Sequence, residues 1–559
     1  MSSLIVAEHE ALKLKSESLN WPSWSMNHRQ ICDLEMLLNG AFYPLTGFLN
    51  RKDYESVCSS SRLSDGRIWP IPVTLDVTEN FAEGIRSGEK IALRDFQGVM
   101  LAVLEVEDIW KPDKIKEANF VYNSDSIEHP GVNYILNSAN GVYVGGRIMG
   151  LELPVYHDFI SLRKTPSELK ELFRANNWKR VVAFQTRNPM HRAHFELVNW
   201  AAKQIDANIL IHPVVGMTKP GDINHFTRVK CYQAIMSKFN PAKSLLALLP
   251  LAMRMAGPRE ALWHALIRKN YGCSHFIVGR DHASPGKDSG GREFYAMDAA
   301  EKYMEEFKEQ IGIEILHFKE MVYIEETIEY CPIEHITPGK KYKTISGTEL
   351  KSFLDRGESI PDWFTFPEVA AVLLRLIKPK QERGLAVFLT GLPSAGKSTI
   401  AKILNVKLLE SGDRKVSLLD GDEVRKLLSS ELGYSKEHRD LNIRRIGFVA
   451  KEITKNGGIA VCAPIAPYDS IRREVKDMIE QEGDFVLVYI NTPLEVCEKR
   501  DRKGLYAKAR AGLLKGFTGI DDPYEEPQNA DLIIDTTVNS AEKCAEIILD
   551  LVKQRGYLP

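Results

Sequence analysis

Residues 385–399, LAVFLTGLPSAGKST, join an apolar run to a glycine-rich turn that ends in Gly396, Lys397 and Ser398. Such a turn can close backbone N–H groups around the β-phosphate of a nucleotide, while the lysine reaches the β- and γ-oxygens and the serine hydroxyl holds Mg²⁺. The apolar run before the turn and the helix-like TIAKILNVKLLE after it are the setting that this chemistry requires. The last third of the chain is therefore predicted to transfer phosphoryl groups.

Further polar residues follow this loop. The segment KVSLLDGDEVRKLL indicates a strand that ends in Asp420 and Asp422, followed by Arg425. Carboxylates at that end of a strand, facing a phosphate loop, can hold Mg²⁺ or accept a hydroxyl proton. A basic run from Lys499 to Lys515 follows the predicted strand FVLVYI. Such a run is usually a solvated helix, but in a nucleotide-binding domain it is better interpreted as a lid over phosphates.

The middle of the chain holds a second candidate site. In TRNPMHRAH, which follows the apolar run VVAFQ, Asn188 suits a helix cap and Pro189 the first helical position, so that His191 and His194 share one face. A helix N-terminus with two histidines and an arginine is a natural anion site, where the histidines donate hydrogen bonds to a developing negative charge. Two alternatives remain open: a zinc site, for which no third ligand lies at the usual spacing, and ordinary surface histidines.

The run HFIVG places the next three residues, Arg280, Asp281 and His282, at the carboxyl end of a neighbouring strand, where ligands bind in open α/β sheets. Between the two segments, Arg254 and Arg259 flank a Met-Ala-Gly-Pro turn. This turn is a candidate mobile basic lid, although a lone arginine is more often simply solvated.

The composition frames these sites. A length of 559 residues predicts three or four domains, and 26% charged residues with a net charge of -2 give no polycation that would favour nucleic acid. No apolar stretch approaches the ~18 residues that span a bilayer, and the first residues lack a signal peptide's apolar core, so no membrane association and a cytoplasmic location are expected. The eight cysteines form no CxxC pair, which predicts free thiols and neither disulfides nor structural zinc.

Four regions are predicted. Residues 1–164 have the short β-type runs of a small β-rich domain, and residues 165–325 alternate strand and helix as in an α/β domain with a parallel sheet. Residues 326–380 are predicted to form a small domain and linker. Residues 381–559 are predicted to form the phosphate-loop domain, again with a parallel sheet.

The segments QTRNPMHRAH, GRDHASPG, LAMRMAGPREALWHA and ISGTEL closely resemble signature segments of the ATP sulfurylases, and LNGAFYPLTGFLN at 38–50 resembles their N-terminal domain. This resemblance covers residues 1 to about 375. It implies a PUA-like domain followed by a Rossmann-like nucleotidyltransferase domain. The implied reaction is attack of sulfate on the α-phosphorus of ATP, which gives adenylyl sulfate (APS) and pyrophosphate.

The same resemblance implies roles for single residues. Sulfate would be held by Gln185, Arg187 and Ala283, with Arg254 as a further substrate contact. The active centre would include Thr186, Arg187, Asn188 and Arg280, while His191 and His194 stabilise the pentavalent α-phosphate. ATP would contact Gly279, Arg280, Asp281, His282 and Val322. Because sulfate is already a fully ionised nucleophile, this reaction needs positioning and charge neutralisation but no general base.

Residues 383–559 resemble the APS kinases in GLPSAGKST, DGDEVR, NIRRIGFVA and KGFTGIDDPYEEP. This resemblance implies that Asp422 is the base for the 3′-hydroxyl of APS and that the product is PAPS. Mg-ATP would lie on Gly391, Ser394, Ala395, Gly396, Lys397, Ser398 and Thr399, with Mg²⁺ on Ser398. APS would contact Arg425, Arg439, Asn442, Lys508, Phe517 and Thr518. The chain departs from the pattern of many relatives at His438 and Leu441, and Ala466 replaces a serine that some relatives phosphorylate.

The combined prediction is a bifunctional enzyme with ATP, sulfate, APS, pyrophosphate and PAPS as small-molecule partners, assembled as a dimer or hexamer. Two alternatives remain open. In the first, the C-terminal third is a regulatory module that binds PAPS without catalysis, although such modules have lost the phosphate loop that is intact here. In the second, the sulfurylase runs in the ATP-forming direction during sulfur oxidation.

Overall fold

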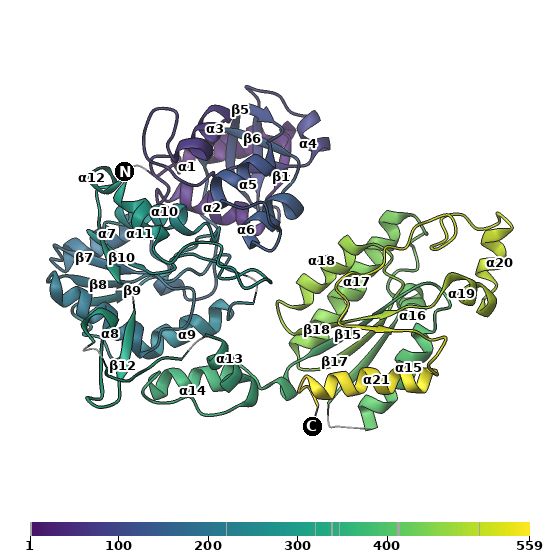
Figure 1. Ribbon diagram of the computed structural model, residues 1–559. Helices are drawn as coiled ribbons and strands as arrows, with labels where there is room; N and C mark the ends of the chain where they lie inside the picture. The colour runs from purple at the N-terminus through teal and green to yellow at the C-terminus, as the bar shows by residue number, and fades with distance from the viewer. Residues whose placement is uncertain are drawn as a thin grey trace. The chain divides into compact units, whose positions relative to one another are not determined.

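The computed structural model describes residues 3–219, 221–318, 320–336, 339–345, 347–410, 414–501 and 503–558. The chain divides into two compact units, which are described separately below (Figure 1). The N-terminal unit is Met1–Ser346 with Ile360–Leu373, and the C-terminal unit is Gly347–Ser359 with Leu374–Pro559. All eight cysteines are free thiols, and no helix within the described ranges is long and apolar enough to cross a membrane.

The N-terminal unit begins with a mixed sheet in the order β1-β4-β5-β6-β2, with β3 paired to β6. Its strands are β1 (Ser23–Ser25), β2 (Gly47–Phe48), β3 (Leu75–Val77), β4 (Lys90–Arg94), β5 (Met100–Trp110) and β6 (Val142–Gly150). The helices between them are α1 (Glu8–Glu17), α2 (His28–Leu38), α3 (Arg51–Ser60), α4 (Glu79–Glu83), α5 (Lys114–Tyr122) and α6 (Pro130–Asn133). The segment therefore contains more helix than its β-rich pattern predicted. Of IWPIPVTLDV only the last three residues form a strand, because Pro70 and Pro72 cannot donate to a ladder.

Residues 165–318 fold as the predicted α/β domain. Its parallel sheet has the order β11-β10-β7-β8-β9. The strands are β7 (Val181–Phe184), β8 (Asn208–Ile211), β9 (Ser244–Leu246), β10 (His275–Gly279) and β11 (Glu314–Phe318). The helices are α7 (Pro166–Ala175), α8 (Arg192–Gln204), α9 (His225–Met236), α10 (Gly257–Asn270), α11 (Ala299–Glu305) and α12 (Lys308–Ile311). The strand order reverses between β7 and β10, so their carboxyl ends form the crevice where such sheets bind ligands.

Two helix boundaries in this domain differ from the prediction. The pattern of EFYAMDAAEKYMEEFK predicts one helix, but the segment forms only α11 and the start of α12. The helix after VVAFQ begins at Arg192 rather than at Pro189. It begins late because the Thr186 hydroxyl accepts from the Asn188 N–H (3.0 Å) and the Tyr232 hydroxyl donates to the Asn188 carbonyl (2.6 Å), which holds these residues in a turn.

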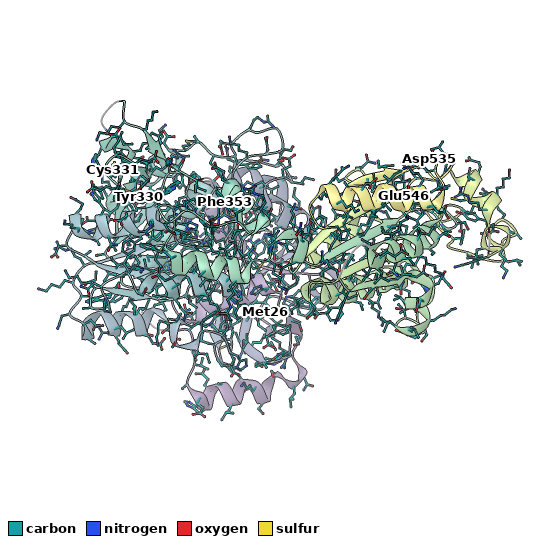
Figure 2. All side chains as sticks on the ribbon, turned by 90° about the horizontal axis from the view of Figure 1, so that it is seen from below. Met26, Tyr330, Cys331, Phe353, Asp535 and Glu546 are labelled. Carbon is teal, nitrogen blue, oxygen red and sulfur yellow. The ribbon has the colours of Figure 1, made fainter. Side chains whose placement is uncertain are left out.

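A small antiparallel sheet follows, with β12 (Met321–Ile324) between β13 (Glu329–Pro332) and β14 (Tyr342–Lys343). Tyr330 and Cys331, labelled in Figure 2, belong to β13. After it come α13 (Gly347–Arg356) and α14 (Pro367–Leu376). Ser346 of the ISGTEL segment lies outside the described residues.

The C-terminal unit contains the predicted parallel sheet, in the order β16-β17-β15-β18-β19. Its strands are β15 (Leu385–Thr390), β16 (Val416–Asp420), β17 (Ile459–Ala463), β18 (Asp484–Ile490) and β19 (Leu532–Ile534). Its helices are α15 (Lys397–Glu410), α16 (Gly421–Leu427), α17 (Lys436–Lys455), α18 (Asp469–Ile479), α19 (Leu494–Arg500), α20 (Leu505–Arg510) and α21 (Ala541–Gln554).

Helices cover both faces of this sheet (Figure 1). Alternate residues of β15 point to opposite faces, so Val387 packs in the cluster that contains Ile400 and Ile548, while Phe388 packs with Ile446 and Val475. The ion pair between Lys407 and Glu546 (3.4 Å), the latter labelled in Figure 2, joins α15 to α21. The central strand is thereby fixed from both sides, and the loop at its carboxyl end is held in place.

Candidate active sites

The phosphate loop connects β15 to α15 as predicted. Three of its residues, Gly391, Ser394 and Gly396, have positive φ angles of 150°, 59° and 107°. A Cβ atom on Gly391 would lie 2.5 Å from the Ile490 carbonyl oxygen, so a larger residue would push β15 and β18 apart. The sequence requirement for glycine at this turn therefore has a steric cause.

Lys397 is buried beneath the loop. Its Nζ donates to the carbonyl oxygens of Gly391 (2.9 Å) and Leu392 (2.7 Å). Burial lowers the pKa of Lys397 to about 8, because the ammonium is removed from water. The loop thus holds a cation whose hydrogen bonds are made to the loop itself.

A cavity of about 1100 Å³ opens above this loop. It is bounded by the loop, the end of β16, the start of α17 and the segment that follows α20. The predicted residues that line it are Ser394, Gly396, Lys397, Ser398, Thr399, Asp422, Arg425, Arg439, Asn442, Phe517 and Thr518. Gly391 and Ala395 are buried below it, where the Ala395 carbonyl accepts from Thr492. Residues far apart in the sequence thereby converge on one pocket.

Lys508 is the predicted contact that the structure does not bring into this cavity. It lies on the exposed face of α20, and the basic run forms only this short helix rather than a long one. Three other basic residues, Arg500, Lys503 and Lys515, line the cavity instead. They belong to the run that the sequence singled out, but its pattern alone does not distinguish the residues that face inward.

The far wall of the cavity is built on α17. The Arg439 guanidinium lies 3.0 Å from the Thr518 hydroxyl, 2.9 Å from the Tyr468 hydroxyl and 2.8 Å from the Asp522 carboxylate. Asn442 is buried and its Oδ1 has no hydrogen-bond partner. The Arg439 contacts hold the turn at 516–518 against α17. The Asn442 side-chain oxygen remains without a protein partner.

Two departures from the APS kinase pattern have local explanations. His438 Nδ1 accepts from the Gly433 N–H (2.9 Å), so this histidine stabilises the loop before α17. Ala466 is fully buried, and its carbonyl accepts from Arg472 (2.7 Å). The sequence of APIAPYDSIRREV predicts an exposed loop with basic residues, which is wrong for Arg472, because this arginine is buried and also donates to the Glu525 carbonyl (2.7 Å). Nothing in the structure explains Leu441.

The second site lies at the carboxyl end of β7. His191 is the N-cap of α8, and its backbone N–H donates to His194 Nδ1 (3.2 Å). The His191 ring lies against Phe364, with 4.4 Å between ring centroids, and is only 5% exposed. Its Nδ1 has no partner. The two histidines are therefore close together as predicted, although they share a helix cap rather than a helix face.

Burial, with a smaller contribution from His194, lowers the pKa of His191 to about 3, and burial lowers that of His194 to about 4. Both rings are neutral near pH 7, and each can donate one N–H. For the zinc alternative, no group of three His, Cys, Asp or Glu side chains able to hold a metal occurs in the described part of the chain.

These lowered values predict that the N-terminal unit loses stability as the pH falls from about 6.5 toward 3. In that window the unfolded chain binds protons on His191 and His194, whereas the folded chain leaves both rings neutral, so acid favours unfolding. Urea midpoints measured between about pH 7 and pH 4 are expected to fall less steeply in a His191→Gln, His194→Gln double variant. An unchanged slope in that variant would contradict the assignment.

Arg187 and Gln185 lie beside this histidine pair in sequence. Arg187 Nη1 lies 2.6 and 2.8 Å from the two oxygens of Asp222, and the Gln185 Oε1 is buried without a partner. Asp222 itself is held by the Lys219 N–H (3.1 Å). Sequence reasoning missed Asp222, since a lone aspartate in a glycine-proline turn carries no pattern.

The segment after β10 begins at the carboxyl end of the strand that neighbours β7. Arg280 lies 3.5 Å from Glu320, and His282 Nε2 lies 2.9 Å from His264 Nδ1. Ala283 has a positive φ of 55°. Val322 is instead fully buried in β12, in the separate antiparallel sheet.

The prediction that the turn between Arg254 and Arg259 is a mobile basic lid is wrong. Arg254 is 2% exposed and donates to the Asp33 carboxylate (2.5 Å) and the Ala252 carbonyl (2.6 Å). Arg259 donates to the carbonyls of Val57 (2.9 Å) and Cys58 (2.7 Å). Both arginines stabilise the packing of the turn against the first domain, so Arg254 is not available to a substrate in this arrangement.

Replacing Arg254 with alanine is expected to destabilise the N-terminal unit by about 3–5 kcal/mol, because Asp33 would remain buried without its partner. Urea unfolding followed by tryptophan fluorescence measures this loss. An Asp33→Asn, Arg254→Ala double variant is expected to lose less stability than the single variant, since no charge stays buried. Loss of activity at unchanged stability would support the lid instead.

Three family models match successive parts of the chain. Family models match residues 1–153 (PUA-like domain), 160–376 (ATP-sulfurylase) and 383–535 (adenylylsulphate kinase). The chain is 50% identical over 549 residues to a sulfate adenylyltransferase of Phaeosphaeria nodorum, and 49% identical over 554 residues to one of Mycosarcoma maydis. Each alignment covers 98% of this chain and 96% of the relative.

A solved structure is similar over the full length. A hexameric APS kinase from Thiobacillus denitrificans aligns with a TM-score of 0.71 and 38% sequence identity. The alignment covers 100% of this chain and 98% of that one.

Proposed function

Because the chain belongs to the sulfate adenylyltransferase family, we propose that its two sites act in succession to activate sulfate. The N-terminal unit joins sulfate to ATP and releases pyrophosphate, and the C-terminal unit phosphorylates the resulting APS at its 3′-hydroxyl to give PAPS. The protein is therefore a bifunctional transferase. The observation that carries the second activity is the intact phosphate loop, whose Lys397 lines one cavity with Asp422 and Arg439.

In the first reaction, an oxygen of sulfate attacks the α-phosphorus of ATP and the bond to the β-phosphate oxygen breaks. We assign sulfate to Gln185, Arg187 and Ala283, and ATP to the segment from Gly279 to His282. Arg187 exchanges Asp222 for sulfate, since both are anionic partners of one guanidinium. The neutral rings of His191 and His194 then donate hydrogen bonds as charge grows on the α-phosphate, with Thr186, Asn188 and Arg280 completing the centre.

In the second reaction, the 3′-oxygen of APS attacks the γ-phosphorus of ATP, Asp422 takes the hydroxyl proton, and ADP leaves. The position of Asp422 supports this role, because its carboxylate lines the cavity above the phosphate loop and pairs there with Lys503. APS is assigned to Arg425, Arg439, Asn442, Phe517 and Thr518. Lys397 neutralises charge on the β- and γ-phosphates.

The residues present fit a magnesium ion with the nucleotide. Ser398 and Asp420 both line the cavity, and Asp420 Oδ2 is buried without a partner while its Oδ1 accepts from the Asp422 N–H (3.0 Å). A hydroxyl and a carboxylate are oxygen ligands of the kind that Mg²⁺ prefers. When bound there, Mg²⁺ neutralises the phosphate charge that the transfer redistributes.

The alternatives are less well supported. A regulatory module without catalysis does not need the steric and hydrogen-bonding detail of the phosphate loop. An ATP-forming sulfurylase would compete for APS with the kinase on its own chain, whereas APS removal by the kinase favours the forward reaction.

The Thiobacillus relative is hexameric, which supports a homo-oligomer for this chain as well. The free cysteines support a reducing compartment such as the cytoplasm.

Incubation of the purified chain with ATP and radiolabelled sulfate tests the proposal, with labelled APS and PAPS separated at successive times. APS is expected first and PAPS after it, and supplied APS is expected to give PAPS and ADP. Formation of APS alone, with supplied APS left unphosphorylated, would favour the regulatory alternative.

A further inference from the structure

Three side chains, Glu260 and His264 of α10 and His282 of the loop that follows β10, form a row. Glu260 and His264 lie one turn apart on α10, with 3.3 Å between Glu260 Oε1 and His264 Nε2. His264 Nδ1 lies 2.9 Å from Nε2 of His282. Both Glu260 and His264 are fully buried, so water does not compete with these contacts. The row ends at the crevice between β7 and β10.

Glu260 is the fixed end of this row. It accepts hydrogen bonds from the backbone N–H groups of Arg254 (2.9 Å) and Ala256 (2.8 Å). Burial opposes its ionisation, but the neighbouring His264 ring, whose Nε2 lies 3.3 Å from Oε1, and these N–H groups outweigh burial and hold the pKa of Glu260 below its usual value. Glu260 is therefore a carboxylate, which accepts hydrogen bonds and cannot donate one.

The carboxylate determines which nitrogen of His264 carries the proton. Since Glu260 only accepts, His264 Nε2 must be the N–H. Burial lowers the pKa of His264 and lowers that of His282 well below its ordinary value, and the Arg268 guanidinium acts in the same direction on both. Both rings are consequently neutral, and a neutral imidazole has one donor and one acceptor. His264 Nδ1 is therefore an acceptor.

The same argument extends to the next ring. Because His264 Nδ1 accepts, His282 Nε2 must donate across the 2.9 Å contact. The remaining nitrogen of His282, Nδ1, then carries a lone pair and no proton. It makes no hydrogen bond with any described residue. A phosphate oxygen cannot satisfy this nitrogen, since it offers no proton at neutral pH.

We propose that Glu260 is a positioning residue which, through His264, fixes His282 as a hydrogen-bond acceptor for an N–H or O–H donor of the bound nucleoside. The donor is either the amino group of the base or a ribose hydroxyl, and the two have the same hydrogen-bonding chemistry. The inference rests on the proposed function in one respect, which is that ATP binds next to residues 279–282. The arrangement makes His282 a determinant of nucleoside recognition rather than a phosphate contact.

The tautomers can be measured directly on the full chain. In protein labelled with ¹⁵N-histidine, the ring-nitrogen shifts of neutral histidine distinguish a protonated from an unprotonated nitrogen, and His264→Gln and His282→Gln variants assign the signals. His282 is expected to be protonated at Nε2 and unprotonated at Nδ1. The opposite tautomer, or a charged ring near pH 7, would overturn the proposal. This measurement needs neither catalysis nor a folded Glu260 variant.

A Glu260→Gln variant tests the consequence. Its amide, unlike a carboxylate, does not oblige His264 Nε2 to donate, so the tautomers of the row are no longer fixed and His282 Nδ1 can become a donor. The KM for ATP, measured by pyrophosphate release, is expected to rise about 10-fold with little change in kcat, as for one lost hydrogen bond. The matched control is Glu314→Gln, because Glu314 pairs with His275 (3.1 Å) at the amino end of β10. That variant is expected to keep the wild-type KM.

Nucleotide analogues identify the donor. Inosine triphosphate lacks the amino group of the base, whereas 2′-deoxy- and 3′-deoxy-ATP each lack one hydroxyl. For the analogue without the contacted donor, wild type and Glu260→Gln are expected to share one KM, while the 10-fold ratio persists for the others. A ratio that persists for every analogue would overturn the proposal. The proposed function would instead be contradicted if the tautomers are as expected and Glu260→Gln weakens the equilibrium binding of ATP, but the wild-type chain forms no APS.

Discussion

Replacement of Lys397 with alanine is expected to lower the rate of APS phosphorylation by about 10²–10³-fold, the cost of removing one preorganised charge contact to a reacting phosphate. The structure supplies the reason: the ammonium is buried below the loop and can turn from the carbonyls of Gly391 and Leu392 to the β- and γ-phosphates. Adenylyl transfer in the same variant is expected to stay at the wild-type rate. ADP release with supplied APS and pyrophosphate release with sulfate measure the two activities separately.

Two further variants sharpen this experiment. Lys397→Met keeps most of the side chain's apolar volume but not its charge, and is expected to be as impaired as the alanine variant. Lys407→Ala removes a lysine of the same helix whose partner is Glu546 on α21, and is expected to leave both rates unchanged. Phosphorylation that survives in both Lys397 variants would refute the assignment of this loop as the kinase site.

Replacement of His191 with alanine is expected to lower adenylyl transfer by about 10²–10³-fold and to spare the kinase. The ring is neutral, packed on Phe364 and placed at the N-terminus of α8, so its free N–H is preorganised for charge on the α-phosphate. A His191→Asn variant retains an N–H donor and is expected to recover part of the rate. Pyrophosphate release at saturating ATP and sulfate measures the effect.

The matched control for this variant is His275→Ala, which removes another buried histidine of the same sheet at the amino end of β10. It leaves a comparable cavity without touching the proposed site, and adenylyl transfer is expected to persist. Equal loss of the sulfurylase and kinase rates in His191→Ala would mean that the two activities are not independent.

The sequence alone was sufficient to predict those elements whose structure depends on residues that are close together in the chain. The phosphate loop, both parallel sheets and the capping box of α7, in which Thr165 accepts from the Glu168 N–H (3.3 Å), could all be predicted from residues that are close in sequence. The convergence of Lys397 and Asp422 on one cavity also followed, because the carboxyl ends of parallel strands meet at one edge, whereas Arg439, on α17, was expected there from the resemblance to the APS kinases.

The errors arise where a distant partner decides the outcome. Arg254 was interpreted as part of a lid because its partner, Asp33, lies 221 positions earlier in the chain. Lys508 was named as an APS contact from the resemblance to the APS kinases, but Lys503 lines the cavity instead, because the packing of the segment around α20 decides which lysine faces inward. The start of α8 moved to Arg192 because Tyr232, on α9, holds the carbonyl of Asn188. None of these contacts has a signature in the neighbouring residues.

The internal hydrogen bonds of Lys397 bear on how one polypeptide handles two tetrahedral oxyanions of similar size. Sulfate must reach the N-terminal unit, yet it resembles a nucleotide's terminal phosphate and is a natural competitor at the other pocket. In that pocket, sulfate would meet the Lys397 ammonium, which already donates to two carbonyls and is partly deprotonated above about pH 8. We therefore expect Lys397 to bind sulfate weakly. A polyphosphate chain offers more oxygens to the surrounding amides, so we expect the resting loop to bind it in preference to sulfate.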